Sequence, residues 1–382
     1  MKRRSVFSLV CLFVVCATAF PVSAGDPTVQ DLLKTVGLKP TGSERGQMDV
    51  VGFVTTAAQM DAVLSQCDTL AAPRRQVINE RYGLSPDAPV IAGVCPHDDY
   101  YYAGRFYSLL VPHIQARTVI VFGVFHKARV FECRDKIVFD AFSAWHGPYG
   151  PVKVSALREE ILKRLPKDDF VVDNDMQMVE HSVEAIVPFL QAYDRDVEIV
   201  SILVPYMDWK TLDRLAGHVS EALAAIMEKK GWRLGADVCV ISSSDAVHYG
   251  DSGWGGQNYA DFGTDVDGYQ TAVERDIALA EDYLSGPIDR EQMGEFMYQF
   301  VDPEDVTKYT IPWCGRFSIP FGVDVASRLT EKLESRRLEG VLLDYGTSVS
   351  EASLDVEGLG GLGPTAPNNL HHWVGYAAAA FR

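Results

Sequence analysis

The sequence has few basic residues for its length. Lys and Arg number 35 among 382 residues, against 52 Asp and Glu, so the formal net charge is −17. A surface with this excess of negative charge repels other polyanions, which argues against nucleic acids and anionic membranes as partners. Linkers rich in proline, serine or charge are also missing, and no internal repeat occurs. We therefore expect one domain rather than several modules.

Cysteine is scarce as well. Of the seven cysteines, two lie in the first 24 residues, and none forms a CxxC pair. That scarcity excludes a disulfide-stabilised scaffold. The other five are an odd number, so in an oxidising compartment at least one thiol stays free, pairs between chains or binds a metal. These five are Cys67, Cys95, Cys133, Cys239 and Cys314.

The first 24 residues have the pattern of a secretory signal. Basic MKRR precedes the apolar run SVFSLVCLFVVCATAF, and PVSA ends in a small-residue cleavage pattern. The apolar run is short for a membrane span, and polar GDPTVQD follows it at once. We predict cleavage after Ala24, giving a secreted or periplasmic chain of residues 25–382 with no membrane attachment. An uncleaved membrane anchor is the alternative.

Strand and helix patterns alternate along the rest of the chain. Continuous apolar runs, typical of strands buried on both faces, occur at 90–94, 118–125, 197–204, 237–244 and 340–346. Helical patterns lie between them, at 57–82, 157–165, 182–193, 209–230, 270–283 and 316–336. Two Gly-rich stretches, 250–267 and 353–369, are expected to be loops. This alternation predicts a single α/β domain with a central, mostly parallel or mixed sheet flanked by helices on both faces.

Three of the nine histidines closely follow predicted strands. His97 comes after VIAGVCP, His126 after TVIVFGVF, and His248 after DVCVISSSDAV. A single such histidine is more often a surface or core residue. Because the carboxyl ends of parallel strands share one edge of a sheet, three of them predict a site there. Imidazole serves both as a metal ligand and as an acid–base group.

Other reactive side chains accompany these histidines. Cys314 comes just before a helical pattern that starts near Arg316, where the helix dipole stabilises a thiolate; a buried apolar cysteine is the alternative. Asp245, three residues before His248, is placed to orient that imidazole. His181 and Glu184 have the spacing of one helix face, which indicates either a face turned to the site or an ordinary polar stripe.

Several motifs carry a resemblance to a known family. PHDDYYYAG is similar to the PHAGYxYSG motif of the Memo family, also called AmmeMemoRadiSam system protein B. VFGVFHK resembles that family's strand ending in GPSHH, and VEHSVEAIVPFLQ resembles EHSxExxLPFLQ. ISSSDAVHYG is similar to SSDFSHYG, WCGRFSIPFG to xCGxxPI, and WVGYAAAAF to the closing SYAAGA strand. The motifs occur in family order from about residue 90 to the C-terminus.

The resemblance implies a fold like that of the class III extradiol ring-cleavage dioxygenases, with a three-ligand metal site. Carried over by position, the ligands are His97, His126 and Cys314, and His248 is the acid–base group with Asp245 beside it. A cysteine in place of the dioxygenases' carboxylate favours softer metals, so the expected metal is iron(II) or copper.

The chain departs from the family pattern near the first two histidines. Asp98 and Asp99 stand where the family has a small Ala-Gly pair, and Lys127 replaces a histidine. The two aspartates are expected to add a ligand or to neutralise the site. Tyr100 and Tyr102 are expected to line the pocket.

Two functions follow from these residues. The first is a metal-dependent, dioxygenase-like oxidoreductase acting on a small molecule. The alternative is a non-catalytic module that binds metal or peptide and keeps the same pocket. A third interpretation treats the polar cluster as a structural relic. The sequence determines neither the metal, nor the substrate, nor the oligomeric state.

Overall fold

A computed structural model describes residues 27–84, 89–350 and 352–382. The predicted signal segment lies outside the described residues, so cleavage after Ala24 stays a prediction. Among the helices that are described, none is both long and apolar enough to cross a bilayer. The five cysteines downstream of that segment are all buried, and all are free thiols.

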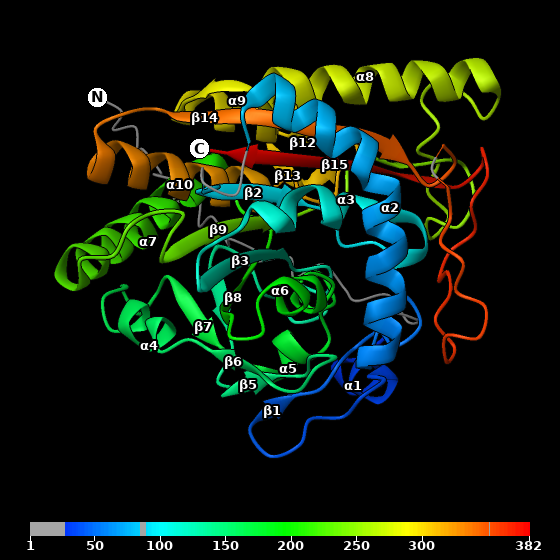
Figure 1. Cartoon of the computed structure of the whole chain (residues 1–382). Helices are drawn as coiled ribbons and strands as arrows, with labels where there is room; N and C mark the ends of the chain where they lie inside the picture. The colour runs from blue at the N-terminus through cyan, green and yellow to red at the C-terminus, as the bar shows by residue number, and fades with distance from the viewer. Residues whose placement is uncertain (1–26, 85–88, 351) are drawn as a thin grey trace, which may run out of the picture.

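The fold is built on one large mixed sheet, whose strands follow one another in Figure 1 from β14 near the top to β5 near the bottom. Five neighbouring strands are parallel, in the spatial order β6, β8, β3, β9 and β2. Their bounds are Val152–Val154, Glu198–Val204, Thr118–Val124, Val238–Ser243 and Ala92–Cys95. The sheet continues beyond β2 with antiparallel β15 (Trp373–Phe381), β14 (Leu338–Thr347) and β11 (Gly286–Ile288).

Shorter strands complete the other edge and a separate hairpin. At that edge lie β1 (Glu44–Arg45), β4 (Ile137–Phe139), β5 (Ala144–Trp145) and β7 (Phe170–Val172). Strand β10 (His248–Tyr249) instead pairs with β15, and β12 (Val301–Asp302) and β13 (Asp305–Tyr309) form the hairpin.

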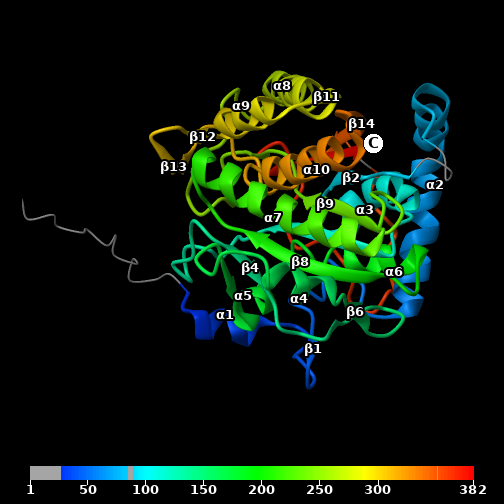
Figure 2. The same ribbon diagram turned by 90° about the vertical axis from the view of Figure 1, so that its left-hand side faces the viewer.

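Helices cover both faces of the sheet, as Figures 1 and 2 show. One face packs against α7 (Trp209–Lys230), α8 (Val266–Leu284), α9 (Arg290–Phe300) and α10 (Ser318–Glu334). The opposite face packs against α2 (Ala57–Tyr82), α3 (Tyr100–Leu110) and α6 (Val187–Tyr193). The remaining helices are short: α1 (Val29–Thr35), η1 (Val111–His113), α4 (Leu157–Leu162) and α5 (Asn174–Met178). The predicted fold class is therefore confirmed.

The apolar runs form strands because both sides of each strand are covered. All seven residues of β3 are buried, and so are all six of β9. A β-branched residue packs well on a pleated surface of this kind. Each of the five predicted runs contains a strand, with differences of one or two residues at the ends.

Two long helices have the predicted bounds because their capping residues mark the ends. Thr56 and Gln59 form a capping box at the start of α2. Asp208 accepts a hydrogen bond of 2.7 Å from the backbone N–H of Thr211 at the start of α7. That helix ends at Gly231, whose φ of 67° lies in the left-handed region.

Two helix predictions that bear on the site need correction, and α3 was not predicted. Residues 182–186 are turns, and α6 begins only at Val187, so His181 and Glu184 do not share a helix face. The last predicted helix begins at Ser318 rather than near Arg316, because residues 314–317 form a turn that follows the bridge at Trp313. Residues 100–110 form helix α3, whereas no helix was predicted for this tyrosine-rich segment.

Candidate metal centre

Three side chains follow neighbouring parallel strands by the same distance. His97, His126 and Asp245 each lie two residues beyond the end of β2, β3 and β9, at the carboxyl edge of the sheet. Cys314 reaches this edge from the segment between β13 and α10. A bridge between Val247 and Trp313, together with a hydrogen bond of 3.3 Å from Cys314 N–H to the Ala246 carbonyl, holds it there.

The Cys314 sulfur contacts both predicted histidine ligands. Its Sγ lies 2.9 Å from Nε2 of His126 and 3.3 Å from Nε2 of His97. The two imidazole rings are 5.1 Å apart between centroids and nearly perpendicular. These three residues therefore direct two nitrogens and one sulfur toward a common point.

Both imidazoles are held through their second ring nitrogen. His97 Nδ1 lies 2.8 Å from Ser243 Oγ, and this hydroxyl donates its own proton to the Ser182 carbonyl. His126 Nδ1 lies 2.9 Å from a carboxylate oxygen of Glu180. Each Nδ1 must therefore carry the proton, which leaves the Nε2 lone pair free for a metal.

Glu180 is ionised in this environment. Burial by itself would raise the pKa of Glu180, but the charges of His126 and His181 and the hydrogen bonds from His126 and Ser182 outweigh it and lower the pKa below its ordinary value. The carboxylate is the natural acceptor for His126 Nδ1–H. Sequence reasoning missed Glu180, although it directly precedes His181; it also missed Ser243, which lies inside the predicted strand.

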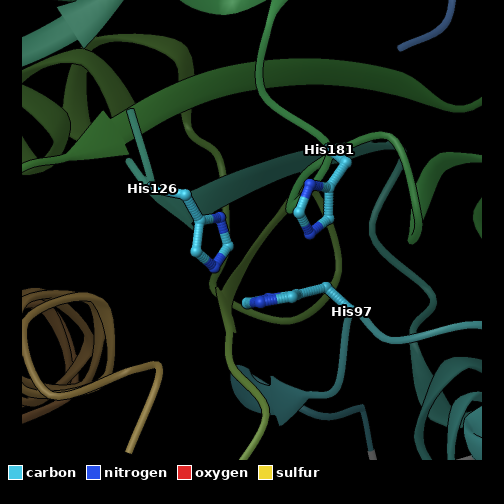
Figure 3. Close-up of side chains that lie close together, drawn as sticks. All are labelled: His97, His126 and His181. Atoms are coloured by element: carbon cyan, nitrogen blue, oxygen red, sulfur yellow. The ribbon is translucent and has the colours of Figure 1, made fainter. Parts of the chain in front are cut away.

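A third imidazole, His181, joins the site, as Figure 3 shows. Its ring stacks on that of His126 at 4.7 Å and meets that of His97 edge-on at 5.6 Å. Within the described residues, two donor groups have ligand atoms within 4.8 Å of one another: His97 with His126 and His181, and His97 with Asp245 and Cys314. Of the three predicted ligands, His126 belongs to the first group, Cys314 belongs to the second, and His97 belongs to both.

The donor set fits a transition metal. Imidazole nitrogen and cysteine sulfur are ligands that iron and copper accept, whereas magnesium and calcium prefer oxygen. Burial raises the pKa of the Cys314 thiol well above its ordinary value, the charge of Asp245 adds to this, and Arg316 opposes it. The thiol is therefore protonated without a metal, and binding of a metal would release that proton.

Asp245 lies beneath His97 rather than beside His248. Its Oδ1 accepts hydrogen bonds from the backbone N–H groups of His97 and Asp98, at 2.8 and 3.1 Å, and its Oδ2 is 3.4 Å from His97 Nε2. The expectation that Asp245 orients His248 was therefore wrong. Because β9 pairs with β2, the chain that leaves β9 places Asp245 against the backbone that leaves β2. The chain then changes direction before it reaches His248 in β10.

His248 faces a cavity that adjoins the donor cluster. The ring stacks on Trp254 at 5.0 Å, and its Nε2 is buried without a hydrogen-bond partner. Burial lowers the pKa of His248 to about 3, and the charges of His126 and Arg316 act in the same direction. The imidazole is therefore neutral near neutral pH. The cavity of about 290 Å³ that it lines also contains His126 and Cys314.

The other predicted pocket residues lie away from this cavity. Asp98 accepts a hydrogen bond of 2.6 Å from Tyr376, and Asp99 accepts from the backbone and hydroxyl of Thr365. The hydroxyls of Tyr100 and Tyr102 donate to the carbonyls of Ala185 and Ala366. Glu184 pairs with buried Arg45 at 2.6 Å. In the described part of the chain, these five bind other segments of the fold and do not line the cavities beside Cys314.

Asp276 on α8 connects the two segments that carry His248 and Cys314. Its Oδ2 accepts from Val247 N–H at 3.2 Å, from Trp313 Nε1–H at 2.9 Å and from the Tyr345 hydroxyl at 3.0 Å. Val247 directly precedes His248, and Trp313 directly precedes Cys314. The buried Asp276 carboxylate therefore fixes the residues that directly precede His248 and Cys314 in the chain.

This carboxylate makes folding stability depend on pH. Burial raises the pKa of Asp276 to about 6, although Arg275 and the three donors oppose that shift. Since the folded pKa exceeds the unfolded one, its stabilising contribution is complete below pH ~4 and is lost as the pH rises to about 6. We expect the free energy of unfolding, relative to Asp276→Asn, to fall by about 3 kcal/mol between pH 4 and 7. Urea unfolding across this range measures it.

The matched control is Asp168→Asn, which changes an exposed carboxyl group. This variant measures the effect of removing one acidic side chain at the surface, for comparison with the buried one. Parallel stability curves for the Asp276→Asn variant and the unsubstituted protein would contradict the assignment.

The site thus belongs to an α/β protein with a His- and Cys-containing cluster at the carboxyl edge of its sheet. The model of the family described as Memo-like protein matches residues 64–357, well over half of the chain. The chain therefore belongs to the Memo-like family. The matched range includes His97, His126, His181, His248 and Cys314.

Individual relatives are similar at modest identity. A MEMO1 family protein of Saccharolobus islandicus is 27% identical over 248 residues, covering 63% of this chain and 72% of the relative. MEMO1 family proteins of Pyrococcus abyssi and Archaeoglobus fulgidus are 32% and 34% identical over 166 and 167 residues. These alignments cover 42% and 43% of this chain, and 54% and 57% of the relatives.

Proposed function

We propose that this protein is a metal-dependent oxidoreductase of the dioxygenase-like kind, with iron(II) or copper held by His97, His126 and Cys314. The observation that carries the proposal is the convergence of the two Nε2 atoms on the Cys314 sulfur, next to a cavity with an unpartnered His248 nitrogen. The resemblance to class III extradiol dioxygenases supports it. When bound, such a metal supplies Lewis acidity and electron transfer.

The protein's own residues have separate parts in this function. Ser243 and Glu180 keep the Nδ1 protons in place, so the imidazoles present their lone pairs in one fixed orientation. Cys314 loses its proton on metal binding. His248, neutral near pH 7, accepts a proton at Nε2 from a bound substrate and later returns it. Trp254 stacks on His248 and lines the same cavity, which fixes the orientation of the imidazole.

Oxygen consumption tests this function. We expect the metal-loaded protein to consume oxygen with at least one of a panel of catechols. His248→Ala should lower kcat by about 10²- to 10⁴-fold, the usual contribution of a general acid–base group. It should leave the metal content unchanged, because His248 belongs to neither donor group. The control is His371→Ala, at an exposed histidine.

Two results would contradict the proposal. Equal rates for the unsubstituted and His248→Ala proteins would remove His248 from the chemistry. A metal-loaded protein that consumes no oxygen with any catechol would instead favour the alternative, a non-catalytic module that binds metal or peptide.

A further inference from the structure

The cavities beside the candidate metal centre contain no carboxylate. One has about 230 Å³ and the other about 290 Å³, and both include His126, Tyr309, Cys314 and Arg316 in their walls. No Asp or Glu is among the described residues that line either one. This is unexpected in a chain with 52 acidic and 35 basic residues.

Arg316 in the shared wall has no acidic partner. Its Nη1 donates to the Trp313 carbonyl, and its guanidinium lies 3.6 Å from the centre of the Tyr309 ring. Its Nε is buried and has no hydrogen-bond partner. Within residues 27–84, 89–350 and 352–382, its contacts are this carbonyl and aromatic rings, and no carboxylate pairs with it. The edge formed by Nε and Nη2 is therefore available for two parallel hydrogen bonds to an oxyanion.

Two further cations lie close by, one in the wall of the smaller cavity and one beside His126 in the chain. Lys127 directly follows His126, and Arg129 lines the smaller cavity, where its Nη2 donates to the Thr307 carbonyl at 2.6 Å. Neither forms an ion pair with another described residue. A bound divalent metal would add to this positive charge. Glu180 pairs with Nδ1 of His126 but lines neither cavity, so no carboxylate among the described residues faces Arg316 and Arg129 there.

We propose that the site binds a small organic molecule through an oxyanion group, a carboxylate or a phosphate, held by the Nε–Nη2 edge of Arg316. Lys127 and Arg129 raise the rate of its association by attracting the negative charge. Cavities of this size fit a molecule smaller than a typical drug. The inference rests on the proposed function, since it names the chemical class of the ligand for the same site.

Calorimetric binding to the full-length, metal-free protein tests the inference. The probes are benzoate and inorganic phosphate, with neutral benzamide as the uncharged analogue of benzoate. We expect at least one anion to bind, and to bind at least tenfold more weakly to Arg316→Gln. The anion that binds identifies the group, and benzamide should not bind. Arg336→Gln, at an exposed arginine paired with Glu334, should leave the affinity unchanged.

Arg316→Lys separates two roles of the guanidinium. The lysine keeps the positive charge near Cys314 but cannot donate two parallel hydrogen bonds to an oxyanion. Anion affinity should therefore fall while metal content stays normal. If Arg316 served only to support the thiolate, Arg316→Gln would lower metal content and leave anion binding unchanged. That result, or equal anion affinity in the unsubstituted and Arg316→Gln proteins, would overturn the proposal.

The two proposals fail in different ways. A protein that binds the anion through Arg316 but no metal would contradict the proposed function alone. A protein that takes up metal but shows no Arg316-dependent anion binding would contradict the present inference alone.

Discussion

His97→Ala should abolish metal binding. His97 is the one residue that belongs to both donor groups, the group with His126 and His181 and the group with Asp245 and Cys314. Its loss leaves neither group with three donors. We expect metal content after loading with iron(II) or copper to fall from about one ion per chain to below about a tenth, because each site needs all its ligands for affinity. Elemental analysis of protein purified without an affinity tag measures this.

Two companion variants decide which group is used. Cys314→Ala should remove the metal if the thiol is a ligand, while His181→Ala should then cause only a partial loss. The opposite pattern would favour the three-imidazole group. His371→Ala is the control, because this histidine is exposed and pairs with Asp251 at the surface. Full metal content in His97→Ala would exclude both donor groups.

Arg45→Ala should have the largest effect on stability. The Arg45 side chain is fully buried, and it donates to Glu184 at 2.6 Å, to the Gln177 carbonyl at 2.9 Å and to the Glu180 carbonyl at 2.5 Å. Removing it leaves a buried carboxylate without its counter-charge, together with unpartnered carbonyl groups. We expect a loss of about 3–5 kcal/mol in the free energy of unfolding, measured by urea denaturation.

The same substitution should also weaken the metal site in the folded protein. Arg45 holds the Glu180 carbonyl, and the Glu180 side chain holds His126 Nδ1. Removing a group that directly holds a ligand, as Glu180 holds His126, typically costs about 10- to 100-fold in metal affinity, and this range is the upper limit for the indirect effect of Arg45→Ala. Metal titration under conditions where the variant remains folded checks this consequence.

Two controls complete the Arg45 experiment. The double substitution Arg45→Met with Glu184→Leu should recover part of the stability, since it removes both buried charges together. Arg134→Ala, at an exposed arginine paired with Asp135, should change stability by less than about 1 kcal/mol. An Arg45→Ala protein as stable as the unsubstituted one would contradict the role of this buried ion pair.

Much of the fold could be predicted because the apolar runs in the sequence are the segments that the folded protein buries as strands. The strands ending near His97, His126 and Asp245 are continuous apolar runs, and such runs are stable only when helices cover both faces. Parallel neighbours then bring the residues that follow them to one edge. The presence of histidines at this edge was therefore a consequence of pattern and topology together.

The partners of these side chains could not be predicted in the same way. Asp245 is three residues from His248 in the chain, yet it binds the backbone of His97. Asp98 and Tyr100 lie one and three residues after His97 along the chain, but they bind segments outside the cavities. Sequence spacing limits where a residue lies along the chain, whereas the direction of its side chain depends on the packing of distant elements.

The sequence by itself determined the α/β class and the strands that lead into the site, and it supplied the prediction of the three ligands. Only the tertiary structure decided that His181 joins them, that Glu180 and Ser243 set the tautomers, and that Arg316 has no acidic partner. The physical reason is that hydrogen bonds and charge pairs act over a few ångströms. Folding brings such groups together from positions tens or hundreds of residues apart.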